Sequence, residues 1–215
     1  PPTKDLNQMA VTIIDHPLAI ERLTRLRNEL TDRTDFRRAL RDLSGFLAYE
    51  ALRSVKVSTI DIDTPVAPTT GVALTNPPLL VPVMRAGLGM LDAVHEVVPE
   101  ARVGFVGLRR DEQTLLPHAY VNTVPEDLNG RPVVVLDPML ATGGSLIHTC
   151  EILRDSNAGQ LTVLCVLAAP EGIKAFEDAG FNADLFTASI DDRLNEVGFI
   201  VPGLGDAGDR QFGLN

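Results

Sequence analysis

The chain of 215 residues is 45% hydrophobic and 22% charged, and it has a formal net charge of -10. This composition excludes a disordered chain and supports the core of one large α/β domain. The acidic charge disfavours a general nucleic-acid binder, which needs a basic surface, but it leaves room for a local cationic pocket that binds a phosphorylated small molecule.

The sequence indicates a soluble protein of the cytoplasm. Cys150 and Cys165 lie in apolar surroundings without the spacing of metal ligands, which is typical of buried thiols in a reducing compartment. The first ten residues lack the basic start and apolar run of a signal peptide. The longest apolar runs have the length of strands, so we expect no membrane span.

The first fifty residues predict two amphipathic helices, because apolar residues recur at helical spacing over 23–30 and again over 36–47. Pro17 suits the start of the first helix, and Thr34 or Asp35 is expected to cap the second. The arginines of this region are expected mostly on solvated faces, with an anion patch or a subunit contact as the alternative. They are Arg22, Arg25, Arg27, Arg37, Arg38 and Arg41.

From residue 55 onward, strands alternate with helices. Residues 55–65 alternate like an edge strand or a hairpin arm. Apolar strands are expected at 78–84, 102–108, 131–137, 161–169 and, last, 183–189, with helices over 85–98, 143–156 and 170–180. Continuous apolar strands separated by helices predict a parallel sheet covered on both faces, which binds ligands beyond the carboxyl ends of its strands where the strand order reverses.

The connection over 109–125 is too long for an ordinary link between elements. Long connections of this kind are often lids, and an arginine on such an arm would close over a ligand and exclude water. A plain surface excursion and an arm that contributes to a dimer are the alternatives. The segment 200–209, with its glycines and proline, is expected to be irregular backbone rather than helix or strand.

The stretch VVVLDPMLATGGS, residues 133–145, combines an apolar strand, one carboxylate and a glycine-rich turn before a helix. Backbone N–H groups of such a turn form a nest for a phosphate at the helix N-terminus. Asp137 beside this nest suits a ligand whose hydroxyl groups lie between the two. The pattern therefore predicts a socket for ribose 5-phosphate, although an ordinary tight turn also uses paired glycines.

Five segments together resemble the uracil phosphoribosyltransferases of the type I phosphoribosyltransferase family. They are DPMLATGGS, PPLLVPVMRAGLGML, NEVGFIVPGLGDAGDRQFG, AAPEGI and RRDEQTL, and the resemblance runs from about Asp15 to Gly213. It implies an α/β fold over residues 1–215, with a central parallel sheet flanked by helices, a protruding arm, and a hood formed by the N-terminal helices and the C-terminal tail. It also implies the transfer of a phosphoribosyl group from phosphoribosyl diphosphate to uracil, which gives uridine monophosphate and diphosphate.

The resemblance also implies the site residues. Phosphoribosyl diphosphate would be bound by Arg85, Arg110, Asp137, Pro138, Met139, Leu140, Ala141, Thr142, Gly143, Gly144, Ser145 and Asp206, and uracil by Ile200, Gly205, Asp206 and Ala207. Arg110, Asp137 and Asp206 would be the catalytic residues. The acceptor of the uracil N1 proton is left open between water, a backbone carbonyl and Asp206. Mg²⁺ would be the cofactor, held mainly by substrate oxygens rather than by a metal site of the protein.

Two positions need a choice. Of Arg109 and Arg110, the arginine nearer the acidic pair matches the family, so Arg109 is expected on the surface. Asp137-Pro138 stands where most of the wider superfamily has two acidic residues, a departure that uracil phosphoribosyltransferases share. Asp137 is therefore the one carboxylate available to the ribose hydroxyl groups.

The expected partners are the two small substrates, a GTP activator, and further copies of the chain in a homodimer or higher homo-oligomer. Neither a nucleic acid nor a membrane is expected. The alternative is a regulator of the same fold that senses pyrimidine nucleotides and binds RNA, which should show a basic face.

Overall fold

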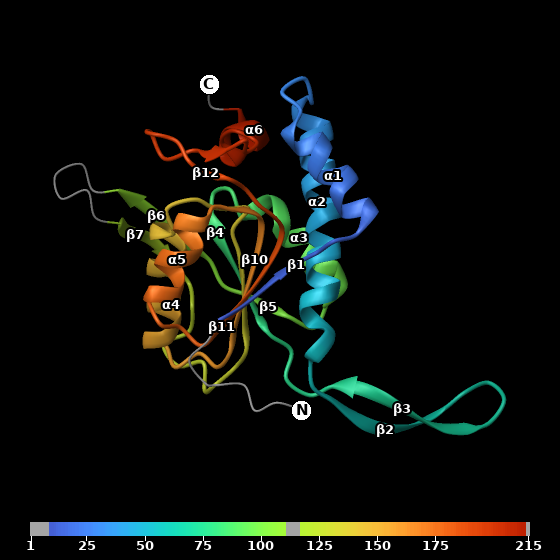
Figure 1. The fold of residues 1–215 in the computed structure, drawn as a ribbon. Helices are drawn as coiled ribbons and strands as arrows, with labels where there is room; N and C mark the ends of the chain where they lie inside the picture. Colours follow the sequence, from blue (N-terminus) through green and yellow to red (C-terminus); the bar gives the residue numbers. More distant parts are fainter. Residues whose placement is uncertain (1–8, 111–116, 214–215) are drawn as a thin grey trace.

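The computed structural model describes residues 9–110 and 117–213, and within them the side chains of all but residues 108–110 and 117–119. Its centre is a sheet with the strand order β1-β11-β10-β8-β4-β6-β7 (Figure 1). Neighbours along this path are parallel, except that β6 and β7 are antiparallel. The strands are β1 (Ala10–Ile13), β4 (Leu79–Met84), β5 (Arg102–Val103), β6 (Val106–Arg110), β7 (Pro117–Asn122), β8 (Val133–Leu136), β9 (Met139–Leu140), β10 (Leu161–Ala168) and β11 (Ala183–Ile190), with β5 beside β4 and β9 beside β10.

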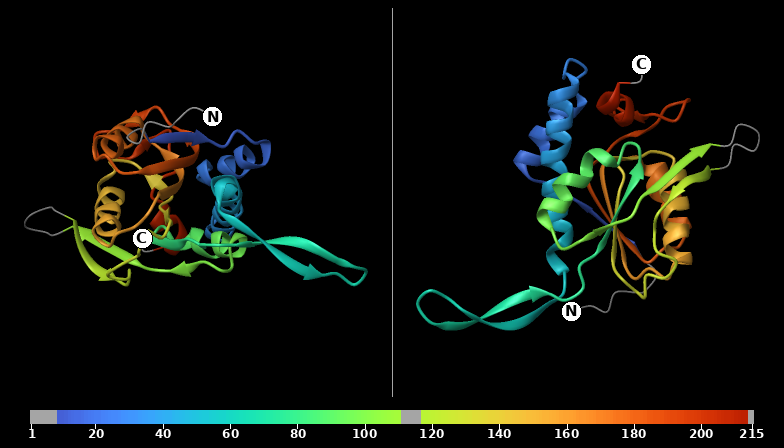
Figure 2. Two further views of the ribbon diagram at one scale, coloured as in Figure 1. Left: turned by 90° about the horizontal axis from the view of Figure 1, so that it is seen from below. Right: turned by 180° about the vertical axis from the view of Figure 1, so that it is seen from behind.

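Helices cover both faces of this sheet, which confirms the predicted α/β fold (Figures 1 and 2). One face carries α1 (Pro17–Arg27), α2 (Arg33–Ala51) and α3 (Leu88–Val97), and the other carries α4 (Gly144–Asp155) and α5 (Pro170–Asp178). Because successive strand residues point to opposite faces, Val134 and Leu136 belong to one apolar core and Val133 and Val135 to the other.

Two side chains set the starts of the N-terminal helices. His16 caps α1 by accepting the N–H of Leu18 at 3.1 Å, and Pro17 is the first residue of α1, as predicted. The cap of α2 is Asp32, which accepts the N–H of Asp35 at 2.9 Å. The expectation that Thr34 or Asp35 caps this helix is wrong, because both residues already lie in its first turn.

The strand order reverses between β4 and β8. The chain runs from β4 to β6 in one direction across the sheet, and from β8 through β10 to β11 in the other. Parallel pairing aligns Pro82 of β4 with Leu136 of β8 at the carboxyl end of the crevice. This is the place where an open parallel sheet binds its ligands.

Several short elements differ from the expectation. The long connection over 109–125 contains regular structure, because β6 and β7 pair as far as Arg110↔Pro117 and form the base of an arm. Residues 111–116 of the predicted lid lie outside the described residues. The strand predicted at 183–189 is confirmed as β11, but it is not the last strand, because β12 (Arg193–Leu194) and β13 (Ile200–Val201) follow it. The additional elements are the edge strand β1, the pair β12 and β13, and the helix α6 (Ala207–Phe212).

A separate two-stranded hairpin of β2 (Val57–Asp63) and β3 (Pro68–Leu74) extends away from the sheet, after the short 3-10 turn Leu52–Ser54 that ends α2 (Figure 1). The prediction of a hairpin arm here is confirmed. At the opposite end of the molecule, β12, β13 and α6 lie over the carboxyl ends of the parallel strands, beside the upper parts of α1 and α2 (Figure 1). Within the described residues, no helix is both long and apolar enough to cross a membrane.

Candidate active site

The loop between β8 and α4 is built as an anion nest. Gly143 takes the left-handed conformation, with φ +84°, and directs the chain into α4. Within the described part of the chain, no protein acceptor receives the N–H groups of residues 142–146. These groups converge at the N-terminal end of a twelve-residue helix, where a phosphate is favoured.

Helix α5 supports this loop from outside. A Cβ on Gly172 would overlap the carbonyl oxygen of Ala141, so the helix approaches the loop at backbone distance. Ile173 donates its N–H to Ala169 at 3.0 Å, which continues α5 directly from the end of β10. The segment AAPEGI therefore supports the loop between β8 and α4.

Asp137 lies at the mouth of the crevice in an environment that disfavours its charge. One carboxylate oxygen accepts the N–H of Met139 at 3.3 Å, and no other donor among the described residues reaches the group. Burial raises the pKa of Asp137 to about 7, and the Met139 bond offsets this only in part. A ligand that offers two hydroxyl donors would supply the hydrogen bonds that the ionised carboxylate lacks.

The two cysteines lie behind this carboxylate. Both are buried and free. Burial raises the pKa of Cys165 to about 12, and it raises the pKa of Cys150 with a further contribution from the charge of Asp137. Both thiols therefore stay protonated and unreactive, as predicted for core residues.

The turn after β4 brings Arg85 to the same crevice. A Cβ on Gly87 would overlap the carbonyl oxygen of Leu136, so this turn packs directly on the end of β8. The side chain of Arg85 is exposed, and its guanidinium lies 3.9 Å from the carboxylate of Asp209. An exposed guanidinium beside the nest suits the oxygens of a diphosphate.

The C-terminal segment is more regular than expected. Ile200 begins β13 and is buried, and Asp206 caps α6 by accepting the N–H of Asp209 at 2.8 Å. Ala207, the first residue of α6, is also buried. The prediction of irregular backbone is correct only for the turn between β13 and α6, which includes Gly205 at φ +81°.

Three of the predicted segments meet at this edge of the sheet. The turn 85–87 contacts α6, where the side chain of Gln211 donates to the carbonyl oxygen of Ala86 at 3.0 Å. Gly198, ahead of β13, lies next to the methyl group of Thr142. The segments that contain the predicted phosphate, diphosphate and base residues are thus neighbours. Arg110 ends β6, and its side chain lies outside the described residues.

Sequence reasoning missed the residues that hold these segments together. Arg210 donates to the carbonyl oxygens of Leu204 at 3.0 Å and Asn28 at 2.7 Å, and it stacks on Phe36 at 4.4 Å. Arg27, expected on a solvated face, instead forms a pair with the buried Asp191. The only sequence signal of Arg27 is its place on an amphipathic helix, which most often means solvent exposure, and Arg210 directly follows a segment that was expected to be irregular.

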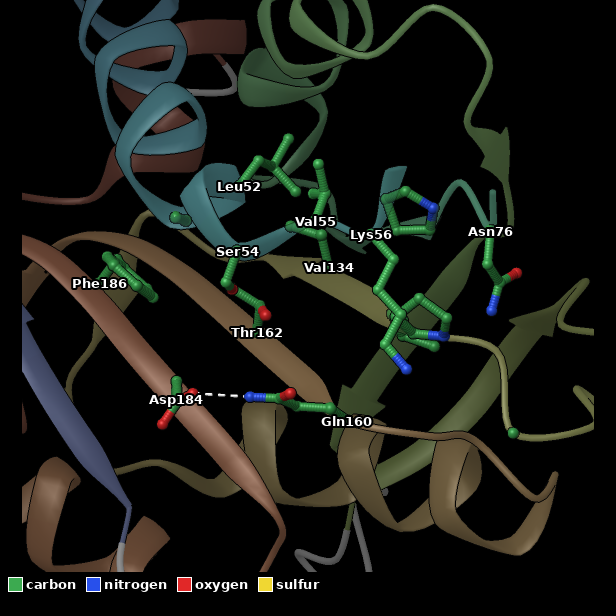
Figure 3. Close-up of a pocket in the computed structure, with 15 residues that line it drawn as sticks. Leu52, Ser54, Val55, Lys56, Asn76, Val134, Gln160, Thr162, Asp184 and Phe186 are labelled. Atoms are coloured by element: carbon green, nitrogen blue, oxygen red, sulfur yellow. Dashed lines mark hydrogen bonds between the residues drawn. The ribbon is translucent and has the colours of Figure 1, made fainter. Parts of the chain in front are cut away.

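A cavity of about 240 Å³ lies at the other end of the sheet, near the amino ends of β8, β10 and β11 (Figure 3). Lys56 and Phe186 line it, and Gln160 donates to Asp184 at 2.7 Å across its floor. Of the predicted site residues that the structure describes, none lines this cavity. It is therefore distinct from the crevice at the carboxyl ends, where parallel sheets bind substrates.

Comparison with known families decides the assignment. The profile of the uracil phosphoribosyltransferase family matches residues 13–214. The chain belongs to this family. A uracil phosphoribosyltransferase of Streptomyces griseus is 52% identical over 208 residues, which cover 95% of this chain and 99% of the relative. One of a Nocardioides species is 52% identical over 211 residues, covering 96% and 99%.

Solved structures agree with the fold of this uracil phosphoribosyltransferase family member. A protein from Aquifex aeolicus superimposes with a TM-score of 0.87 at 38% identity, covering 95% of this chain and 99% of the other. An adenine phosphoribosyltransferase from Trypanosoma brucei, bound to AMP, pyrophosphate and ribose 5-phosphate, has a TM-score of 0.55 at 11% identity, covering 87% and 86%. The second likeness shows the type I phosphoribosyltransferase fold alone.

Proposed function

We propose that the chain transfers the phosphoribosyl group of phosphoribosyl diphosphate to uracil and releases uridine monophosphate and diphosphate. One observation carries this proposal. Where the strand order reverses, the carboxylate of Asp137, which accepts only one hydrogen bond among the described residues, lies beside the backbone N–H groups of residues 142–146, which have no protein acceptor there. A ribose 5-phosphate satisfies both at once, because its hydroxyl groups and its phosphate stand on opposite sides of one ring. Nothing in the described residues or in the comparisons favours the RNA-binding alternative.

Each segment has a separate task in this reaction. The N–H groups of 142–146 hold the 5′-phosphate, and Asp137 accepts the ribose hydroxyl groups. Arg85 binds the diphosphate, and Arg110 joins it from the arm when the ligand is present. The bond from C1 of the ribose to the diphosphate breaks while the bond from C1 to N1 of uracil forms, and N1 gives up its proton to water, a backbone carbonyl or Asp206. Positioning of the substrates and neutralisation of the departing diphosphate charge accelerate this step.

Uracil binds between Ile200 and the start of α6. The N–H of Ala207 and the turn at Gly205 present fixed backbone groups, which read the donor and acceptor pattern of the base. Asp206 faces the phosphoribosyl diphosphate while its carboxylate caps α6. The same side chain thereby ties the base segment to the other substrate.

Mg²⁺ fits this site as an ion that arrives with the substrate. Among the described residues, no three His, Cys, Asp or Glu side chains cluster as metal ligands. Asp137 nevertheless keeps one carboxylate oxygen without a protein donor, and Mg²⁺ characteristically uses one or two carboxylates, waters and substrate phosphates. When bound, the ion would neutralise the diphosphate.

Three further features belong to this proposal. A homodimer or larger assembly would cover the β2–β3 hairpin, since all of β2 is exposed and an isolated two-stranded hairpin is barely stable in water. Activation by GTP is proposed from the family alone. Adding GTP to the activity assay tests this proposal. A reducing compartment such as the cytoplasm suits the two free thiols.

An assay that measures by chromatography the uridine monophosphate formed from uracil and phosphoribosyl diphosphate tests the proposal. We expect product with uracil and none with cytosine, adenine or hypoxanthine, and a loss of product on addition of a Mg²⁺ chelator. Product with a purine base and none with uracil would overturn the assignment. Sedimentation of the same preparation reports the assembly state.

A further inference from the structure

An ion pair between a partly buried arginine and a buried aspartate joins the first helix to the residue that follows β11. Arg27 donates through Nη1 to Oδ2 of Asp191 at 2.7 Å and through Nη2 to Oδ1 at 2.6 Å, so the contact is bidentate. Asp191 is only 6% exposed. Ser189 adds a hydrogen bond from its hydroxyl group at 3.0 Å. The pair connects α1 with the end of β11, outside every segment assigned to substrate binding.

Both backbone polar groups of Gly203 are held by this pair. The N–H of Gly203 donates to Asp191 at 2.8 Å, and its carbonyl oxygen accepts from Arg27 at 3.0 Å. Gly203 has φ +66°, and a Cβ there would overlap the carbonyl oxygen of Ile200. The turn that follows Ile200 is therefore fixed at its tightest point by two side chains from distant parts of the chain.

The surroundings of Asp191 keep its carboxylate charged. Burial alone would raise the pKa of Asp191, but the hydrogen bonds from Arg27, Gly203 and Ser189 and the charge of Arg27 outweigh burial and hold this pKa below its usual value. Asp191 therefore stays ionised over the working pH range. Loss of Arg27 would leave a buried carboxylate without an opposite charge, held only by the hydrogen bonds from Gly203 and Ser189, which favours rearrangement of the turn.

We propose that Arg27 and Asp191 are positioning residues for the nucleobase, because their ion pair holds Gly203 and thereby sets the place of the segment from Ile200 to Ala207. This rests on the proposed function, in which that segment binds uracil. The phosphate nest has its own support in α5, and within this segment Asp206 is the one residue that is also assigned to phosphoribosyl diphosphate. The pair therefore acts mainly on the base.

The same helix offers a matched control. Arg22 donates to Asp42 at 2.7 Å and ties α1 to α2, and both side chains of this pair are also partly buried. The Arg22–Asp42 pair makes no hydrogen bond to the described part of the C-terminal segment. It therefore measures the effect of a lost ion pair on α1 without the effect on the base segment.

Steady-state kinetics of the wild-type protein and five variants test the proposal. In Asp191→Asn and Arg27→Gln we expect the KM for uracil to rise by about ten-fold or more, the expected size for lost hydrogen bonds to charged groups, while the KM for phosphoribosyl diphosphate stays within about two-fold. Arg27→Lys keeps the charge but not the bidentate geometry, so it should recover part of the loss. Asp42→Asn and Arg22→Gln should change neither KM.

Different results would overturn the positioning role of Arg27 and Asp191 and the proposed function. An active wild-type protein whose Asp191→Asn and Arg27→Lys variants keep the uracil KM of the controls would overturn this inference alone, as would an equal rise in both KM values. A wild-type protein that forms no uridine monophosphate would overturn the proposed function, and the inference with it. Near-ultraviolet circular dichroism identifies any variant that does not fold, and Arg27→Lys then decides.

Discussion

Gly172 of α5 touches the backbone of Ala141 so closely that no side chain fits between them. The loop proposed to bind the phosphate thus depends for its position on Gly172, which lies far along the chain from it. A methyl group at this position must move either the helix or the loop. Because α5 is buried against the sheet through Phe176, the loop is the part that gives way.

Gly172→Ala should therefore weaken the binding of phosphoribosyl diphosphate more than the binding of uracil. A displaced nest loses several hydrogen bonds to a charged group, each of about 1.5–3 kcal/mol, so we expect the KM for phosphoribosyl diphosphate to rise by roughly ten-fold or more. Gly45→Ala is the control, since nothing lies within 4 Å of a Cβ there, and it should leave both KM values unchanged. Unaltered kinetics in Gly172→Ala would show that the loop does not depend on α5.

Asp137→Asn should make the ligand-free protein more stable and less active. The folded pKa of about 7 lies above the unfolded value of 3.8, so the folded state retains a proton that the unfolded state has lost. The free energy of unfolding of the wild-type protein should accordingly fall as pH rises from about 4 to about 7. The asparagine removes this cost, roughly 2–4 kcal/mol once the partial exposure of the group is allowed for.

Thermal unfolding between pH 4 and 8 measures this effect. The Tm difference between Asp137→Asn and the wild-type protein should grow up to about pH 7 and then level off. At the same time kcat/KM should drop by about ten- to a hundred-fold, because the charged acceptor for the ribose is gone. A Tm difference that does not vary with pH would mean that Asp137 titrates at its ordinary value.

Arg85→Ala should discriminate between ligands. Since the exposed guanidinium is assigned to the diphosphate, binding of phosphoribosyl diphosphate and of diphosphate should weaken by about ten- to a hundred-fold, and uridine monophosphate should be nearly unaffected. Calorimetric titration of the three ligands measures this. Arg53→Ala, which removes an exposed arginine paired with Glu50, is the control. An equal loss for all three ligands would place Arg85 outside the diphosphate site.

Ala207→Pro tests whether the backbone reads the base. Ala207 is the first residue of α6, and Asp206 before it has φ -83° and ψ 114°. Proline is tolerated at the first position of a helix and after an extended residue, so the substitution removes one N–H without breaking the helix. We expect the affinity for uracil to fall by about ten-fold or more, because one buried hydrogen bond to the base is not made.

Ile200→Val keeps every backbone group, so this variant should retain the preference for uracil over cytosine. Comparable rates with both bases in the wild-type protein would contradict backbone recognition.

The loops of the site were predictable and their supports were not. Asp137 and the glycines after it stand out because they end an apolar strand, and the strand-and-helix alternation places such ends at one edge of the sheet. β1 escaped prediction because its four residues are half exposed on an edge strand. Arg27 resembled five other arginines on two amphipathic helices, and nothing in the local pattern indicates a partner as distant as Asp191.

The bond between Arg27 and Asp191 spans 164 positions. A ribosome that adds about 5–20 residues per second needs roughly ten to thirty seconds to deliver Asp191 after Arg27 has been made. During that interval Arg27 of α1 has no Asp191 to pair with. The carbonyl oxygen of Asn28, just after α1, likewise lacks its donor until Arg210 has been made. The residues proposed to bind the phosphate are therefore synthesised well before Asp191, one of the two residues that position the segment proposed to bind the base.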